Sequence, residues 1–371
     1  MASMLIDGLM MRMTKRHREL AKELSPILQK SDQKEIYTFF NFTLWFARRY
    51  AATYEMDGTI YLVLDNSLIQ AFKHRTSNLK RATHALAYTA FCRFVQNWSD
   101  RESHLALSPM AVYEHLGRRI PNSEREVNDT LIDLQHLLHG TGLRVAMLGF
   151  ETSEDLFNKL KDIAEDEQYL TQLVKDIDKS NWEVDLSAPL GVKIPMSVAW
   201  RALPDQLPLR YFDDWYVHFV LSARIEQHII NQCRDAEIKP IGSGRLATTL
   251  ADLNTFSRNG LLKGLGDIDL LQICDISRQY SEAPGYVLSG QTLDRDLADA
   301  LSQRHVFHIH SGFNGGDPQR KERIKEMVSL MLGKPFAEEE RRGKRIQEQL
   351  IDFAEILADI CKTATSTPAE N

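Results

Sequence analysis

An aspartate stands directly after a strongly apolar predicted strand. Asp65 follows the run 60–64, and the chain continues with Asn66 and Ser67 into a helical pattern. A strand this apolar belongs inside a sheet, and open α/β sheets bind ligands at the carboxyl ends of their strands. Burying a lone charge there costs several kcal/mol unless a cation or hydrogen bonds offset it. Asp65 is therefore the first candidate for chemistry.

A glutamate occupies a similar position further along the chain. Ser108 and Pro109 follow a short apolar stretch and provide the N-cap and first residue of a helix. Glu114 comes three and four residues after Ala111 and Met110, so its carboxylate shares the apolar face of that helix. Glutamate on an apolar face is uncommon unless it is paired or binds a metal.

Two aspartates near the end of the chain complete the acidic set. Asp267 is expected to open a helix over 267–280, at the start of its buried stripe. Asp269 is two residues further on and points away from that stripe, which makes it the weaker candidate. Thr292 and Asp294 follow the predicted strand 286–289 as a Thr-x-Asp sequence at another helix start.

This ordered set of acids resembles the pattern of the PIN-like nuclease superfamily. That pattern has an acid after the first strand, a Glu on a later helix, an Asp opening a helix and a Thr-x-Asp after the next strand. The matches, in chain order, are Asp65-Asn66-Ser67-Leu68, Tyr113-Glu114, Asp267-Ile268-Asp269-Leu270 and Thr292-Leu293-Asp294. The stretch from Glu114 to Asp267 is much longer than in compact members, so another acid such as Glu226 remains an alternative second acid.

The resemblance implies a metal-dependent nuclease, with RNA a more expected substrate than DNA by family analogy. Its Mg²⁺ or Mn²⁺ ligands, direct or through water, would be Asp65, Glu114, Asp267 and Asp294. Supporting positions would be Asn66, Ser67, Asp269, Thr292 and Asp296, and substrate phosphates would meet Lys73, Arg75, Arg81 and Arg295. Hard divalent ions prefer such carboxylate oxygens, and Mg²⁺ keeps several waters. A second basic run lies at 320–325.

The elements that would position these residues alternate between strands and helices. Such alternation predicts an α/β fold with a mainly parallel, Rossmann-like sheet flanked by helices. Strands are expected at 60–64, 105–107, 144–150, 286–289 and 306–310. The expected organisation is an N-terminal helical segment (1–56), a PIN-like core (57–118 and 260–312), a mostly helical insertion (119–259), C-terminal helices (313–363) and a disordered tail (364–371).

Composition narrows the class of protein. The chain has 371 residues, 43% of them hydrophobic and 26% charged, which is typical of a globular protein with a sizeable core. It has no apolar run of the roughly 18–20 residues that a membrane span needs, and its N-terminus lacks a clear signal-peptide cleavage site. Four scattered cysteines favour a reducing, cytoplasmic setting over disulfides or zinc. The net charge of −6 argues against a protein that coats nucleic acid non-specifically.

Other interpretations stay open beside the nuclease. Each acid alone has an ordinary structural role as a helix cap or first-turn residue. The helical additions could make the protein a non-catalytic interaction module on a PIN-like scaffold, or bind a regulatory partner or a second copy. A phosphoesterase acting on small nucleotides is a further alternative. Within the nuclease interpretation, the added helices fit a regulated toxin or defence-type ribonuclease. Glu55-Met56-Asp57-Gly58-Thr59 departs from the dehalogenase-type phosphatase loop, because Glu stands at the nucleophile position.

Overall fold

A four-stranded, all-parallel sheet lies at the centre of the protein. The computed structural model describes residues 15–53, 58–179, 203–237, 264–275, 279, 285–298, 300–301 and 336–366. The spatial order of the strands is β3 (Val145–Met147), β2 (Ser103–Leu107), β1 (Thr59–Leu64) and β4 (Tyr286–Gln291). Leu62 pairs with Leu105 on one side and Ser289 on the other, so β1 is a central strand. The predicted α/β class with a parallel sheet is therefore confirmed.

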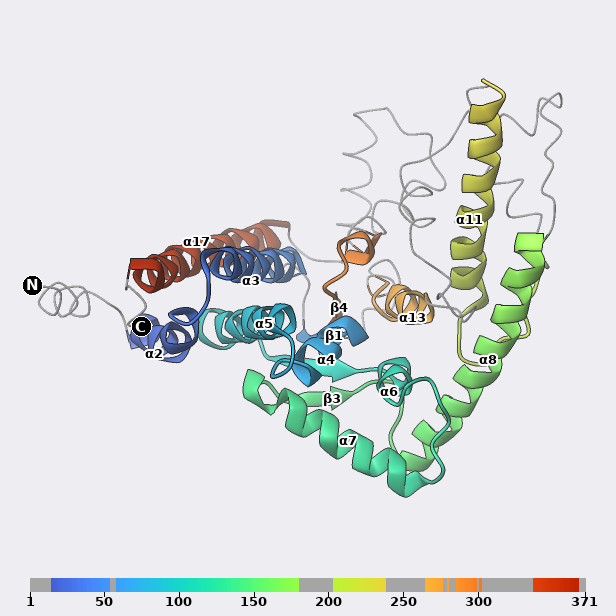
Figure 1. The fold of residues 1–371 in the computed structure, drawn as a ribbon, viewed down its shortest axis with the longest axis horizontal. Coiled ribbons are helices and arrows are strands. Elements are labelled where there is room, and N and C mark those ends of the chain that lie inside the picture. The colour runs from blue at the N-terminus through green and yellow to red at the C-terminus, as the bar shows by residue number, and fades with distance from the viewer. Residues whose placement is uncertain are drawn as a thin grey trace, which may run out of the picture.

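Helices surround this sheet (Figure 1). Those that the structure describes are α2 (Lys15–Leu28), α3 (Gln33–Thr53), α4 (Asn66–Lys73), α5 (Leu79–Trp98), α6 (Pro109–His115), α7 (Glu124–Leu138), the short η1 (His139–Thr141), α8 (Ser153–Lys179), α11 (Asp214–Asp235), α13 (Leu265–Ile273) and α17 (Phe336–Ser366). The N-terminal helices α2 and α3 and the C-terminal helix α17 gather beside α5, and α7, α8, α11 and α13 lie on the other side of the molecule. The helices α2, α3 and α17 are thus part of one helical layer.

The helical layer is held by an aromatic core between α3 and α5. Phe46 stacks on Phe91 with ring centroids 5.7 Å apart, and its edge-on contact with Tyr88 measures 4.9 Å. Phe353 of α17 adds a ring 4.9 Å from Phe94. Large aromatic side chains bury much apolar area, so this layer is packed firmly against the sheet-bearing part of the chain.

Most predicted elements are confirmed, and the differences have local causes. The strand expected within 144–150 is the shorter β3, which brings a strand from the predicted insertion into the sheet. The helix expected over 267–280 is α13, which begins at Leu265 and ends at Ile273, and Asp275 just beyond it accepts the Tyr216 hydroxyl. The tail expected from 364 was wrong in part, since α17 continues to Ser366.

Several predictions lie outside the described residues. They are the strand at 306–310, the helix at 245–256 and the basic run at 320–325. No helix among the described residues is both long and apolar enough to cross a membrane.

Candidate acidic site

Asp65 lies where β1 ends and α4 begins. Its backbone amide donates to the Gln291 carbonyl of β4 at 2.9 Å, and its carboxylate caps α4 by accepting from the Ser67 amide at 3.2 Å. The Ser67 hydroxyl also donates to Oδ2, as does the Thr292 hydroxyl at 2.8 Å. Burial raises the pKa of Asp65 above its ordinary value, and these hydrogen bonds oppose that shift. Two chain segments far apart in sequence therefore fix this carboxylate.

The segment after β4 carries the second carboxylate of the set. Asp294 is exposed, and its side chain accepts from the amides of Asp296 at 2.9 Å and Leu297 at 3.2 Å. Thr292 is fully buried and accepts from the Asp294 amide at 3.0 Å. This is N-cap geometry, and it leaves the rest of the Asp294 carboxylate exposed near Asp65.

Glu114 projects from α6 toward the beginning of α13. Its side chain is only 10% exposed, and Oε1 accepts from Arg118 Nη2 at 2.8 Å. Gly266 lies so close that a Cβ placed there would be 3.0 Å from Glu114 Oε2. A side chain at position 266 would push this carboxylate away. Burial raises the pKa of Glu114 to about 7, with Asp65 and Asp269 contributing and Arg118 opposing.

Asp267 is the residue at which the acids meet. Burial raises its pKa well above the ordinary value, and the negative charges of Asp65, Asp294 and Glu114 raise it further. Among the described residues, Arg118 is the cation that opposes this shift. The four predicted acids thus come from four separate elements, and Asp65, Asp294 and Glu114 each lie close enough to Asp267 to raise its pKa. They gather beyond the carboxyl ends of β1, β2 and β4, where parallel sheets place ligand sites.

The five predicted supporting residues differ in what they contact. Ser67 and Thr292 both contact Asp65, as expected. Asp269 instead accepts from the hydroxyls of Ser108 at 2.6 Å and Tyr211 at 2.7 Å, which makes it a buried link between α13, α6 and the segment before α11. Burial raises its pKa to about 6. Of the remaining two, the Asn66 side chain accepts from Gln70, and Asp296 is exposed.

The four predicted phosphate-binding cations also differ in position. Arg81 Nη1 donates to the Ser67 carbonyl at 3.2 Å, which places its guanidinium beside the first turn of α4. Arg295 is exposed next to Asp294. Lys73 is close enough to His115 to lower the pKa of that imidazole, and Arg75 approaches Gly140 in η1. Arg81 and Arg295 are therefore the two predicted cations that adjoin residues of the acidic site, Ser67 and Asp294.

Sequence reasoning missed the cation within the site. Arg118 adopts a left-handed backbone conformation, with φ of 61°, directly after Gly117. Its guanidinium joins Glu114 to Glu167 of α8, which it reaches at 3.3 Å. The Tyr113 hydroxyl donates to the same Glu167 at 2.8 Å. The i,i+4 spacing of Glu114 and Arg118 is the sequence signal that could have identified this pair. The contact with Glu167 has no such local signal.

The carboxylates are not arranged as a complete metal cage. Across the described residues, no group of three or more His, Cys, Asp or Glu side chains is placed to hold a metal ion. The donor set still suits Mg²⁺ or Mn²⁺, because these ions bind through one or two carboxylates and keep waters for the remaining positions. Comparisons with protein-family models, with curated proteins and with solved structures give no match.

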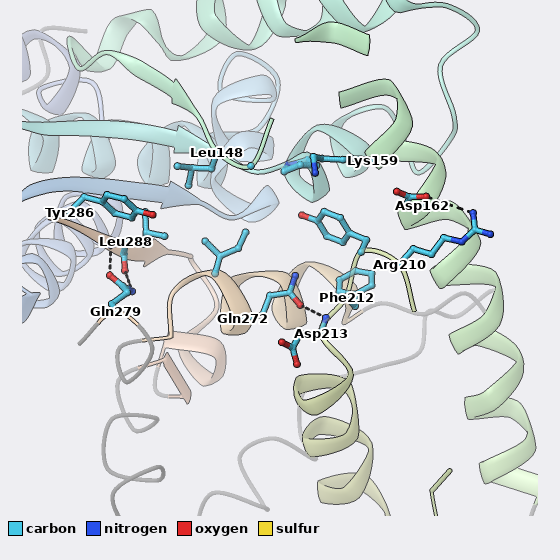
Figure 2. Close-up of a pocket in the computed structure, with 14 residues that line it drawn as sticks. Leu148, Lys159, Asp162, Arg210, Phe212, Asp213, Gln272, Gln279, Tyr286 and Leu288 are labelled. Carbon is cyan, nitrogen blue, oxygen red and sulfur yellow. Dashed lines mark hydrogen bonds and ion pairs between the residues drawn. The ribbon is translucent and has the colours of Figure 1, made fainter. Parts of the chain in front are cut away.

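A separate cavity of about 580 Å³ lies beside β4 and α13 (Figure 2). Its polar side chains already have partners. Gln279 pairs with the Leu288 backbone at 2.7 and 3.1 Å, and Gln272 accepts from the Asp213 amide at 3.0 Å. Arg210 contacts Glu165 at 2.6 Å. None of the four acids lines this cavity, so we place the chemistry at the acidic site.

Proposed function

We propose that the protein is a metal-dependent nuclease that hydrolyses phosphodiester bonds, with Asp65, Glu114, Asp267 and Asp294 as the acidic site. The observation that carries this proposal is the position of Asp267, whose pKa is raised by burial and then by three other acids from separate parts of the chain. Four clustered carboxylates with one nearby arginine are costly to maintain unless a cation joins them. Divalent metal binding is the simplest use of such a set.

The chemistry of the donors supports Mg²⁺ or Mn²⁺. When bound, such an ion supplies charge stabilisation at phosphate oxygens and lowers the pKa of a coordinated water. Asp65 and Asp267 are the best candidates to hold it, since Asp65 is fixed by Ser67 and Thr292 and Asp267 is surrounded by the other acids. Glu114, with a pKa of about 7, loses its proton near neutral pH and then adds a third carboxylate.

Cations beside the acids would hold the substrate. Arg295 is exposed one residue after Asp294, and Arg81 lies beside α4. A nucleic acid backbone passing over the acids would meet these guanidinium groups, which bind phosphate through paired N–H donors. The preference for RNA rests on the resemblance to the PIN-like pattern alone, and so does a role as a regulated toxin or defence-type ribonuclease. In that setting α2, α3 and α17 would bind a regulatory protein or a second copy.

Cleavage assays test the proposal directly. Labelled single-stranded RNA and DNA are incubated with purified protein in Mn²⁺, Mg²⁺ or EDTA, and Mn²⁺ binding is measured by calorimetry. We expect metal-dependent cutting that is lost in Asp65→Ala and Asp294→Ala. The matched control is Asp352→Ala, which removes an exposed acid of α17 that is not among the candidate site residues.

The other outcomes separate the alternatives. A folded wild type that neither cuts nor binds Mn²⁺ would contradict the proposal and favour the non-catalytic interaction protein. Hydrolysis of small nucleotides but not polymers would favour the phosphoesterase.

A further inference from the structure

One face of α3 forms a groove rich in aromatic side chains. Tyr37, Asn41 and Trp45 follow one another at intervals of four residues, so they form one stripe along the helix. The groove holds about 470 Å³ and also takes in Arg295 from the segment after β4. Its lining consists of Tyr37, Thr38, Phe40, Asn41, Phe42, Leu44, Trp45, Arg48 and Arg295.

This stripe is distinct from the face of α3 that packs in the core. Phe39 and Phe46 are fully buried, whereas Tyr37 is 70% exposed and Arg48 is exposed. Phe40 and Trp45 are half-buried, with part of each ring open to the groove. An exposed tyrosine beside half-open rings contributes little to folding. Its placement needs another explanation.

The groove is connected to the acidic site through Arg49. This guanidinium lies over the Trp45 ring, 5.0 Å from its centroid, and Phe42 meets the same ring edge-on at 5.8 Å. Arg49 Nη2 also donates to the Gly290 carbonyl of β4 at 2.9 Å. Two residues after Gly290, Thr292 donates to Asp65. Trp45 is therefore held in a fixed position relative to the strand that ends at the acids.

We propose that this groove binds the unpaired bases of a single-stranded nucleic acid whose backbone continues past Arg295 into the acidic site. Bases stack on aromatic rings regardless of sequence, and arginines beside the rings meet the phosphates. Tyr37 and Trp45 supply the rings, and Arg48 and Arg295 supply positive charge complementary to the backbone. A duplex keeps its bases stacked internally, so the groove selects single strands. This inference rests on the proposed function and adds the site that holds the strand.

Binding measured without catalysis tests the groove. The full chain carrying Asp65→Asn is titrated in EDTA against labelled single strands of about 12 nucleotides, a length typical of such sites, and against the matching duplex. RNA and DNA arms identify the preferred sugar. We expect single strands to bind more tightly than duplex, and Tyr37→Ala to weaken binding roughly 5- to 100-fold, as loss of one stacked base does.

Two further variants keep the test specific. Arg48→Glu reverses an exposed charge in the groove and is expected to weaken binding and reduce its salt dependence. Tyr286→Ala is the matched control, because Tyr286 is a 41% exposed tyrosine at the other end of β4, outside the groove. Its binding should equal that of the parent protein.

The outcomes separate this inference from the proposed function. Equal binding by Tyr37→Ala, Arg48→Glu and the parent would overturn the proposal that the groove binds single strands, whatever the cleavage assay gives. Metal-dependent cleavage by a wild type that binds no single strand would also overturn the groove and leave the nuclease standing. If the wild type binds single strands through the groove but never cleaves them, the binding proposal is supported and the proposed nuclease function is contradicted. Self-association abolished by Tyr37→Ala, without nucleic acid binding, would make this face an interface between copies.

Discussion

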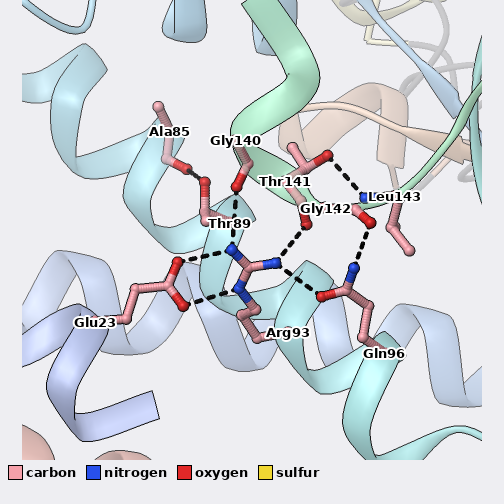
Figure 3. A network of polar contacts seen from close by, with 9 residues as sticks. All are labelled: Glu23, Ala85, Thr89, Arg93, Gln96, Gly140, Thr141, Gly142 and Leu143. Atoms are coloured by element: carbon pink, nitrogen blue, oxygen red, sulfur yellow. Dashed lines mark hydrogen bonds and ion pairs between the residues drawn. The ribbon is translucent and has the colours of Figure 1, made fainter. Parts of the chain in front are cut away.

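The acidic site and the surroundings of Arg93 differ in how far their charges are paired. Arg93 of α5 is paired on every side (Figure 3): Nε and Nη2 donate to the Glu23 carboxylate at 2.9 and 3.0 Å, and Nη1 donates to Gln96 Oε1 at 2.8 Å and the Thr141 carbonyl at 3.1 Å. The acidic site gathers four carboxylates beside Arg118. Satisfied polar groups stabilise a fold, whereas unmatched charges lower its stability and are retained where a ligand will match them.

The comparison assigns different roles to the two regions. Arg93 joins α2, α5 and η1, so its contacts hold the helical layer to the part of the chain before β3. In the acidic site Asp65 caps α4 and Glu114 pairs with Arg118, but the charges of Asp65, Asp294 and Glu114 all oppose ionisation of Asp267. If this contrast is correct, variants of the acids change activity more than stability, and variants of the Arg93 cluster do the reverse.

The largest effect is expected for Asp267→Asn. Because Asp267 lies among the other three acids, losing its charge should reduce metal-dependent cleavage roughly a hundred-fold or more, as loss of several kcal/mol of metal-centred stabilisation does. The variant should fold normally. The matched control is Asp269→Asn, two residues along the same helix and bonded to Ser108 and Tyr211. Equal losses of activity in both variants would remove the distinction between the two aspartates.

The pH dependence of stability is the second test. Glu114 has a pKa of about 7 in the folded protein against 4.5 ordinarily, so the folded protein keeps a proton that the unfolded chain has released. The free energy of unfolding should then fall as pH rises between these two values, by roughly 3 kcal/mol at most. Urea unfolding in EDTA at several pH values measures it.

Glu114→Gln provides the control for that pH dependence. The glutamine variant cannot release a proton, so its stability relative to the wild type should increase as pH rises toward neutrality. If the stability difference between the two proteins stays constant with pH, Glu114 is ionised at all of these values. Its charge would then be matched by Arg118, as that of Glu23 is by Arg93.

The sequence predicted the sheet well because its signals are local. The apolar run 60–64 is buried on both faces and gives β1, and Ser108 caps α6 with its hydroxyl as the sequence indicates. Asp65, Asp267 and Asp294 follow from strand ends and helix starts in the same way, and Glu114 from its place on the apolar face of α6. The contact of Tyr216 with Asp275, just after the shorter α13, could not be predicted, because 59 residues separate the two. The contact between Arg118 and Glu167 could not be predicted either, since 49 residues separate the two partners. The pairing of Arg118 with Glu114 is local, at i,i+4, and could have been read from the sequence.

A moderate effect on stability alone is expected for Arg93→Ala. It removes donors to Glu23, Gln96 and the Thr141 carbonyl and leaves a partly buried carboxylate unpaired. Urea unfolding should show a loss of roughly 1–3 kcal/mol, the range for charged hydrogen bonds that are broken on one side. Cleavage per folded molecule should be unchanged. Arg119→Ala is the control, because its pairing with Glu126 is on the surface, where such pairs contribute little to stability. Reduced turnover in Arg93→Ala would show that the two regions are coupled.

The smallest effect is expected at a residue adjacent to the acids. Tyr113 precedes Glu114 on α6, but its hydroxyl donates to Glu167, which also accepts from Arg118. Tyr113→Phe keeps the buried ring and removes one hydrogen bond of two, so stability should fall by about 1 kcal/mol. Cleavage and Mn²⁺ affinity should not change, because Arg118 still contacts both Glu114 and Glu167. A large loss of Mn²⁺ affinity would instead mean that the Tyr113 bond to Glu167 helps to hold Arg118 against Glu114. The paired charges of Arg118 and Glu167 would then help to position the acids.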